Sequence, residues 1–283
     1  MKQNSAAKAK KIFSTSVVRL VLILFTLIVL LPILWTIITS FKTSAEFLGN
    51  PWALPSGLQW ENYANAFAKA NIGSYFLNSF YVTVVGIAFV LVLGVPTAYV
   101  TSRFKFRFSK VISLLFMAGL FVSQNYIVVP IFLILIQLDM LGSLTMLALV
   151  YAVCALPFSI YLLSGFLRTI PKDYEEAAQI DGCGYSATLL RVIMPMAKPA
   201  LVTVIMFNFM SFWNEYILAL TVLDQDKTTL SVGLLNLMEI QKFATDWGAM
   251  FAGLVIAMLP TMLVYVFVQG KLTQGISMGG LKG

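Results

Sequence analysis

Residues 176–182 of this chain read Glu-Ala-Ala-Gln-Ile-Asp-Gly, and nine residues later residues 192–195 read Val-Ile-Met-Pro. This patterned segment lies between two long apolar stretches, residues 144–167 and 200–222. Hydrophobic residues make up 59% of the chain and charged residues only 11%, whereas an ordinary soluble domain has about 25% charged residues. The composition therefore indicates an all-α integral membrane protein.

The patterned segment predicts two short helices joined by a tight turn. Acidic side chains within residues 173–176 complement the positive end of a helix dipole, which favours a helix from about Lys172 to Ile180. Gly182 ends this helix because glycine tolerates the backbone conformation of a sharp turn. We expect a second helix at about residues 186–193, after which Pro195 bounds the entry to the next apolar stretch.

Membrane-spanning helices are predicted where an apolar run reaches the ~20 residues needed to cross the hydrocarbon core. Six runs reach this length: Leu20–Thr39, Tyr75–Ser102, Val111–Leu135, Leu144–Leu167, Ala200–Val222 and Trp247–Gln269. The chain shows no internal three-plus-three repeat, so six helices would form only half of a transport pathway.

Orientation follows from the Lys and Arg residues that flank the six runs, because cytoplasmic loops carry an excess of both. Fifteen basic residues lie on one side and four on the other. The side with fifteen holds both termini and the patterned segment, so we expect all three in the cytoplasm.

Several classes of function are excluded by the charged and sulfur-containing residues. The net charge of +7 is divided among short flanks, which suits anionic lipid headgroups and does not indicate a nucleic-acid partner. Cys154 lies inside the fourth predicted span and Cys183 in the patterned segment, so a disulfide is not expected. With no His and two separated Cys, neither a zinc site nor a His-based catalytic site is expected.

The spacing of Glu176-Ala177-Ala178, Gly182 and Pro195 resembles the cytoplasmic coupling loop of ABC importer permeases. The chain also resembles, nearly end to end, the carbohydrate-uptake branch of that family, specifically the maltose-type second permease subunit. The segments that carry this wider resemblance are Ser40-Phe41-Lys42, Asn78-Ser79, Leu156-Pro157-Phe158, Ile170-Pro171, residues 212–216 (Phe-Trp-Asn-Glu-Tyr) and residues 279–283 (Gly-Gly-Leu-Lys-Gly).

The resemblance implies the type I ABC importer permease (MetI-like) fold, with six transmembrane helices and both termini cytoplasmic. It divides the chain into a basic N-terminal segment at residues 1–19, a transmembrane domain at residues 20–269 with its coupling loop at 171–199, and a tail at residues 270–283. It implies a multi-pass protein of a bacterial or archaeal cell (inner) membrane. Two departures are Val192 and Met194, where the motif usually has Ile and Leu. The sequence of residues 274–278 is looser, so the family's insertion of the tail between ATPase subunits carries over less well.

The resemblance also implies partners: a second homologous permease subunit, a homodimer of ATPase subunits, an extracytoplasmic solute-binding protein, a sugar substrate and membrane lipid. The only Gly-Lys pair, Gly270-Lys271, lacks the upstream Gly of a phosphate-binding loop. We therefore expect no cofactor on this chain and no enzymatic activity, with ATP and Mg bound by the ATPase subunits. The residues expected to couple to the ATPase are Glu175, Glu176, Ala177, Ala178, Asp181, Gly182 and Pro195. The alternative interpretation is that the acidic residues only cap an interfacial helix.

A candidate solute pathway follows from the polar residues inside the spans. Glu215 is the only charged residue that cannot be assigned to a flank or loop, and an ionisable residue within a span is a functional candidate. Asn208, Ser211 and Glu215 would share one face of a continuous fifth helix. The third predicted span holds a second polar cluster, Ser123-Gln124-Asn125-Tyr126, and both clusters are expected in the outer half of the bilayer. The predicted pathway residues are Gln124, Asn125, Tyr126, Asn208, Ser211, Asn214 and Glu215.

Other interpretations of these residues and of the chain stay open from the sequence alone. Polar groups often join helices within membranes, and Glu215 could pair with the partner permease. The substrate could be glycerol-phosphate or another polyol derivative. From a different class, the chain could be a proton-coupled secondary carrier that uses Glu215.

Overall fold

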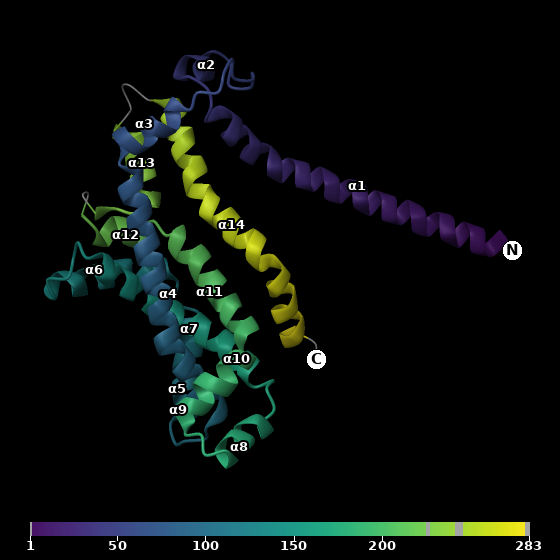
Figure 1. Ribbon diagram of the computed structural model, residues 1–283, viewed down its shortest axis with the longest axis vertical. Helices are drawn as coiled ribbons and strands as arrows, with labels where there is room; N and C mark the ends of the chain where they lie inside the picture. The colour runs from purple at the N-terminus through teal and green to yellow at the C-terminus, as the bar shows by residue number, and fades with distance from the viewer. Residues whose placement is uncertain (1, 225–226, 241–245, 281–283) are drawn as a thin grey trace. The chain divides into compact units, whose positions relative to one another are not determined.

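The structure is a computed structural model that describes the backbone of residues 2–224, 227–240 and 246–280. Side chains are described for residues 15–68, 71–224, 227–235 and 246–270, so the predicted basic residues 2–11 and most of the predicted tail lie outside the described side chains. Within the described residues all regular structure is helical, as predicted (Figure 1). The chain divides into two compact units, residues 1–70 with 237–256, and residues 71–236 with 257–283.

The first unit is organised by a cluster of aromatic side chains at the C-terminal end of its longest helix. Trp35 lies 5.5 Å from both Trp52 and Phe251 and 6.2 Å from Phe47, measured between ring centroids. Most apolar side chains of residues 17–34 are exposed, which suits a helix surrounded by lipid. The helices that contribute to this unit are α1 (Lys2–Thr39), α2 (Ser44–Gly49), α3 (Glu61–Ala70) and the first part of α14 (Trp247–Gly280).

The segment Ser40-Phe41-Lys42 connects the first unit internally. Lys42 is buried, and its ammonium group donates a hydrogen bond to the Pro51 carbonyl at 2.7 Å. The Asn62 amide donates to the carbonyls of Ser40 and Lys42, both at 2.8 Å. A buried ammonium is costly unless it is hydrogen-bonded, so these contacts explain why a Lys is tolerated here.

The second unit is centred on two long helices, α4 and α7, which pack along each other. Val90, Leu147, Ala148 and Ala152 are fully buried between them and their neighbours. The helices of this unit are α4 (Ile72–Arg103), α5 (Ser109–Gly119), α6 (Gln124–Gln137), α7 (Leu144–Leu167), α8 (Asp173–Ile180), α9 (Tyr185–Thr188), the π-helical turn η1 (Leu189–Ile193), α10 (Met194–Met196), α11 (Lys198–Trp213), α12 (Ile217–Val222), the first part of α13 (Leu230–Ile240) and the remainder of α14.

Four helical segments among the described residues are long and apolar enough to cross a membrane: Thr15–Thr39, Ile72–Arg103, Leu144–Leu167 and Trp247–Gly270. They correspond to the first, second, fourth and sixth predicted spans. The helices do not stop at the predicted domain boundaries, since α1 begins at Lys2 and α14 continues to Gly280.

The third predicted span, residues 111–135, is not one continuous helix. It consists of α5 and α6, which meet at an angle of 104°. Ser123 has an extended backbone at the start of α6, and Ser favours such capping positions over helix interiors. A Cβ at Gly119 would lie 2.8 Å from Pro157 of α7, so the end of α5 is held close to that helix.

The fifth predicted span, residues 200–222, is also interrupted. Helix α11 ends at Trp213, and α12 begins at Ile217. The Glu215 carboxylate accepts hydrogen bonds from the backbone N–H groups of Leu218 at 2.8 Å and Ala219 at 3.0 Å. These donors would have no partner at a new helix start, so Glu215 stabilises the break. The prediction that Glu215 continues the helical face of Asn208 and Ser211 is therefore wrong.

The contact between α4 and α13 allows a test of packing by single glycine substitutions. A Cβ at Gly233 would overlap the Tyr75 ring, whereas a Cβ at Gly165 of α7 would meet no atom within 4 Å. We expect Gly233→Ala to destabilise the protein by about 1–3 kcal/mol from overpacking, a cost larger than the gain of about 1 kcal/mol in helix propensity. Gly165→Ala is the matched control and should be neutral or slightly stabilising. Thermal unfolding in detergent, followed by tryptophan fluorescence, measures both; equal midpoints would contradict the packing.

Candidate functional site

The first helix of the patterned segment, α8, ends in a hydrogen-bonded glycine turn. Gly182 has φ +79°, a left-handed conformation that favours glycine. Its N–H donates to the Gln179 carbonyl at 3.0 Å, and the Cys183 N–H donates to the Ala178 carbonyl at 2.9 Å. These two bonds form a Schellman motif. The predicted helix from about Lys172 to Ile180 and its termination at Gly182 are confirmed.

The second part of the segment is a continuous helical run, residues 185–196, that bends sharply into α11. Its middle turn, η1, is π-helical, and the angle between this run and α11 is 80°. Pro195 lies in the last turn of the run, and the Ala197 N–H donates to the Ile193 carbonyl at 2.8 Å. The predicted second helix, residues 186–193, is therefore present and extends by one residue before and three residues after its predicted ends.

Helix α8 and the run of residues 185–196 together form a pair of short helices, called the helix pair below. The helix pair has an inner and an outer face. Glu175 and Ala178 are buried, so these two side chains face the chain itself. Glu176, Ala177, Asp181, Gly182 and Pro195 are exposed. The outer face also presents apolar side chains, among which Ile180 is 87% exposed and Tyr185 66% exposed. Exposed apolar groups beside the turn of a polar loop are a feature of interaction surfaces.

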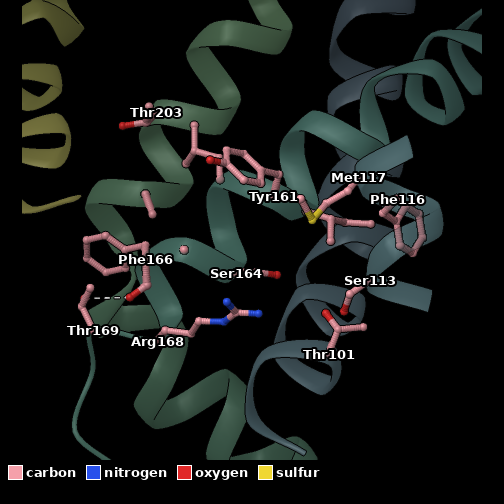
Figure 2. A pocket seen from close by; sticks show the side chains of 14 residues that line it. Thr101, Ser113, Phe116, Met117, Tyr161, Ser164, Phe166, Arg168, Thr169 and Thr203 are labelled. Carbon is pink, nitrogen blue, oxygen red and sulfur yellow. Dashed lines mark hydrogen bonds between the residues drawn. The ribbon is translucent and has the colours of Figure 1, made fainter. Parts of the chain in front are cut away.

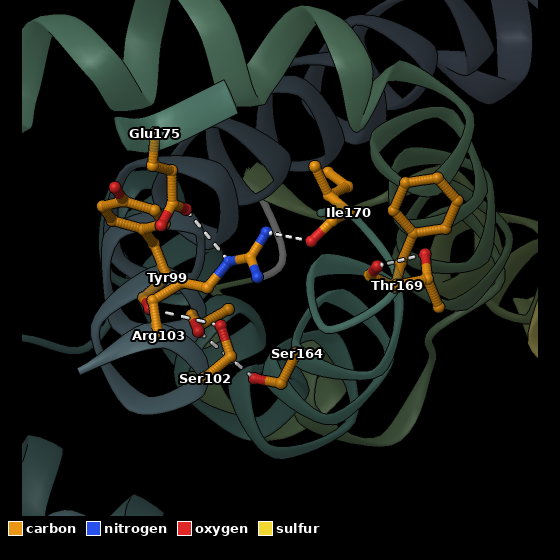
Figure 3. Close-up of polar contacts among 9 residues, drawn as sticks. Tyr99, Ser102, Arg103, Ser164, Thr169, Ile170 and Glu175 are labelled. Carbon is orange, nitrogen blue, oxygen red and sulfur yellow. Dashed lines mark hydrogen bonds and ion pairs between the residues drawn. The ribbon is translucent and has the colours of Figure 1, made fainter. Parts of the chain in front are cut away.

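An ion pair holds the helix pair against the end of α4. Arg103 Nε lies 3.0 Å from Glu175 Oε1, and both side chains are buried, at 4% and 12% exposed (Figure 3). The N–H does not point directly at the carboxylate oxygen, so the contact is an ion pair and not an aligned hydrogen bond. A second guanidinium nitrogen of Arg103 donates to the Ile170 carbonyl at 2.7 Å. The Arg103 side chain therefore connects α4 both to α8 and to Ile170, which lies in the segment between α7 and α8.

Aromatic side chains connect the same end of α4 to the second short helix. The Phe104 ring lies 5.5 Å from Tyr99 and 5.4 Å from Tyr185, in both cases edge to face. Such pairs stabilise by about 0.5–1.5 kcal/mol beyond the area they bury. Together with the ion pair, they attach both short helices to the end of α4.

A separate cavity of about 290 Å³ brings together part of the predicted solute pathway. Gln124 of α6 and Asn208 and Ser211 of α11 line it, so the two predicted polar clusters meet although neither predicted span is continuous. The Asn208 amide donates to Ser159 Oγ at 3.0 Å and to the Val204 carbonyl at 2.8 Å. The remaining lining residues are Tyr151, Cys154, Ala155, Phe158, Phe207 and Phe212.

Glu215 lies beside this cavity, where it is hydrogen-bonded to the lining residue Tyr151. The Tyr151 hydroxyl donates to Glu215 Oε2, and the same carboxylate accepts the two backbone N–H groups at the start of α12. Glu215 thus has three donors within its own chain. The predicted alternative, in which polar groups join helices, describes this contact well.

Besides Glu215, three predicted pathway residues are not among the residues that line the cavity. Asn125 and Tyr126 are exposed, the latter at 83%. Asn214 is exposed, and its amide donates to the Met210 carbonyl at 2.8 Å. Their role in a pathway stays a prediction.

Two residues with clear structural roles were not singled out by the sequence as site residues. Arg103 contributed to the prediction of orientation only as one basic residue among fifteen, and Tyr151 lies within an apolar run. Their partners are 72 and 64 residues away along the chain, so no local pattern indicates the pairs.

Residues 91–278 match the family described as "Binding-protein-dependent transport system inner membrane component". The chain is 39% identical over 259 residues to the diacetylchitobiose uptake system permease protein NgcG of Streptomyces coelicolor, covering 91% of this chain and 86% of that protein. It is 29% identical to the multiple sugar-binding transport system permease protein MsmG of Streptococcus mutans, covering 92% and 94%.

The fold is similar to that of a solved transporter chain. A crystal structure of a bacterial ABC transporter involved in the import of the acidic polysaccharide alginate matches with a TM-score of 0.81 and 25% identity, covering 93% of this chain and 97% of that chain. The similarity extends over nearly the whole length of both chains, and the all-helical MetI-like fold expected from the sequence is confirmed. The chain belongs to the binding-protein-dependent transport system inner membrane components, the multi-pass, non-enzymatic permease subunits of ABC importers.

Proposed function

We propose that this chain is the permease subunit of an ATP-driven importer for a neutral sugar or oligosaccharide and that residues 173–196 couple it to the ATPase. The observation that carries the proposal is the packed helix pair, which is attached to α4 by Arg103 and exposes Ile180 beside the Gly182 turn. The sugar substrate is supported by the names of the relatives, which describe uptake of diacetylchitobiose and binding of multiple sugars.

The proposed topology has six crossings with both termini in the cytoplasm. The four long apolar helices account for four crossings, and the bent pairs α5–α6 and α9–α11 account for one each. The excess of Lys and Arg on the side of the helix pair supports a cytoplasmic position for that pair.

Coupling would proceed through the two faces of the helix pair. The ATPase would contact the outer face, which includes Glu176, Ala177, Asp181 and Gly182. Glu175 and Ala178 would act from the inner face, where Glu175 holds Arg103, and Pro195 lies just before the 80° bend into α11. Movement of the outer face would then be transmitted to α4 and α11 together.

The proposed assembly requires other chains. A second homologous permease would complete the pathway, a homodimer of ATPase subunits would bind ATP and Mg, and an extracytoplasmic binding protein would deliver the solute. This division is supported by membership of a family whose description names dependence on a binding protein.

The cavity at Gln124, Asn208 and Ser211 is the proposed polar part of the solute pathway. It combines amide and hydroxyl groups with the rings of Phe158, Phe207 and Phe212, a combination that suits a hydroxylated solute with apolar ring faces. Its lining holds no Lys or Arg, so it favours a neutral sugar over glycerol-phosphate. A proton-coupled carrier remains the competing class, but Glu215 already has three hydrogen-bond donors in a capping role.

The energy source can be tested directly. We expect uptake of labelled diacetylchitobiose or a related neutral oligosaccharide into vesicles that contain this chain, its partner permease, the ATPase and the binding protein. Uptake should require ATP and persist when a protonophore is added. Loss of uptake with the protonophore while ATP is present would instead identify a proton-coupled carrier.

The ion pair predicts a defect in coupling that a double substitution should relieve. Arg103→Gln or Glu175→Gln leaves a buried charge without its partner, which typically costs about 3–5 kcal/mol. We expect transport per ATP hydrolysed in the reconstituted complex to fall about tenfold in each single variant. The double variant removes both charges and should recover part of the loss. Lys105→Gln, at an exposed position two residues further on, is the control. Additive losses in the double variant would show that the pair does not act as a unit.

Gln124 lines the cavity and its neighbour Asn125 does not, although the sequence predicts both as pathway residues. Gln124→Leu should raise the solute concentration for half-maximal transport about fivefold, because roughly one hydrogen bond of about 1 kcal/mol is lost. Asn125→Leu is the matched control and should have little effect, since Asn125 does not line the cavity. ATP hydrolysis without solute should be unchanged in both. Equal effects of the two substitutions on transport would remove this cavity from the pathway.

A further inference from the structure

A further cavity of the second unit contains none of the predicted pathway residues. It has a volume of about 540 Å³ and is lined by side chains of α4, α5, α7 and α11 (Figure 2). It lies at the end of α7 from which the chain continues into the helix pair. Nothing in the proposed transport mechanism uses it.

A guanidinium group enters this cavity without a carboxylate partner. Arg168 immediately follows the last residue of α7, and its side chain points into the cavity, toward Thr101 and Ser113 (Figure 2). Arg168 forms no ion pair with an acidic side chain of the described residues. Arg168 therefore offers a positive charge and several N–H donors that no described acidic side chain neutralises.

Four of the six hydroxyl groups around the cavity already donate to a backbone carbonyl, and Ser164 is one of them, at 3.5 Å from the Ala98 carbonyl. Thr101 donates to the Thr97 carbonyl at 2.7 Å, Thr169 to the Phe166 carbonyl at 2.7 Å and Thr203 to the Pro199 carbonyl at 2.9 Å. A sugar needs donors and acceptors distributed around its ring, and these hydroxyls can supply only acceptors. The groups left to donate to a ligand are the Ser113 and Tyr161 hydroxyls and the Arg168 guanidinium, of which only the guanidinium is charged.

The remaining wall of the cavity is mainly apolar. Phe116 and Met117 of α5 and Ile160 and Leu162 of α7 contribute much of it. One cationic group in a cavity whose wall is mainly apolar matches a ligand with one anionic group and hydrocarbon chains. Basic pockets between transmembrane helices on the cytoplasmic side bind lipid headgroups for this reason.

We propose that this cavity binds an anionic phospholipid, with the lipid phosphate on the Arg168 guanidinium and an acyl chain along Phe116, Met117 and Leu162. The assignment to the cytoplasmic leaflet rests on the proposed topology, but the site itself does not depend on the transported solute. The bound lipid would fill the space between α5 and the end of α7, next to the start of the helix pair.

The test measures which lipid the assembled transporter retains. The complete complex is placed in nanodiscs of phosphatidylcholine and phosphatidylglycerol, released, and its retained lipids are identified by native mass spectrometry. We expect the wild type to retain phosphatidylglycerol preferentially. Arg168→Gln should lower this retention about tenfold, in line with the loss of a charge-assisted contact. Arg168→Lys should keep part of the retention, because a point charge still attracts phosphate.

Two further variants separate headgroup, chain and net charge. Lys110→Gln removes the same charge from an exposed position on α5 and should retain lipid like the wild type. Gly165→Leu should reduce retention with Arg168 intact, because its side chain would enter free space in the cavity.

Equal retention of both lipids, or unchanged retention in Arg168→Gln, would overturn the proposal. Displacement of the lipid by millimolar inorganic phosphate would show a simple anion site, and displacement by diacetylchitobiose would show a solute site; either would also overturn it. Failure of ATP-dependent uptake would contradict the proposed transport function. The lipid retained by the complex would still test this site, because that measurement does not depend on transport.

Discussion

A chain that crosses lipid must satisfy every backbone polar group from within, and this constraint explains where the helices of this protein break. An unpaired N–H or carbonyl in hydrocarbon costs several kcal/mol, so an interruption is tolerated only where protein groups replace the lost bonds. Glu215 provides two acceptors where α12 starts after α11 ends. At the start of α13, Ser79 accepts the Leu230 N–H at 2.8 Å, and Asn78 donates to the Thr228 carbonyl at 2.9 Å. The polar motifs of the family thus stabilise breaks in helices as well as serving any role in transport.

The same reasoning applies to the buried charges near the helix pair. Burying Arg103 and Glu175 has a desolvation cost that their attraction offsets only partly, so the pair is weak evidence for stability. Its geometry is more informative, because one guanidinium contacts α8 and the Ile170 carbonyl while belonging to α4. Helix α4 is also the helix that packs along α7. In the proposed mechanism, a displacement of α8 would therefore act on the centre of the second unit through this one side chain.

The sequence predicted what depends on local pattern and missed what depends on distant partners. Apolar run lengths located the four uninterrupted spanning helices, and Gly182 with its flanking residues predicted the turn after α8. The breaks within the third and fifth predicted spans were missed although polar residues lie at both, Ser123 with Gln124 and Asn214 with Glu215. The sequence analysis interpreted these residues as the lining of a solute pathway, whereas Glu215 caps the start of α12. The sequence does not indicate that Gly119 must lack a side chain, because Pro157, which packs against it, is distant along the chain. Continuous helices would place the clusters of Gln124 and Asn208 at similar depth in the membrane. The two residues do line one cavity, but the helix that carries Gln124 is bent at the junction of α5 and α6.

Helix α7 carries two different chemical environments, and their separation has a consequence for mechanism. Tyr151 lies near one end, at a neutral cavity with Gln124 and Asn208, and Arg168 follows the other end at a cationic one. At about 1.5 Å per residue the two are roughly 25 Å apart, most of the thickness of a hydrocarbon core of about 30 Å. A neutral solute can be held by hydrogen bonds at the first cavity without interacting with the charge at the second. The cationic cavity lies at the end of α7 from which the chain continues into the helix pair, so in the proposed mechanism its occupant would affect the packing of α5 and α7 close to that pair. The two cavities adjoin along α7, since Phe158 lines the first and Ile160 the second. In the proposed mechanism the polar groups that would hold the solute and the charge of Arg168 are nonetheless separated, so a ligand at Arg168 would act closer to the helix pair than to the solute.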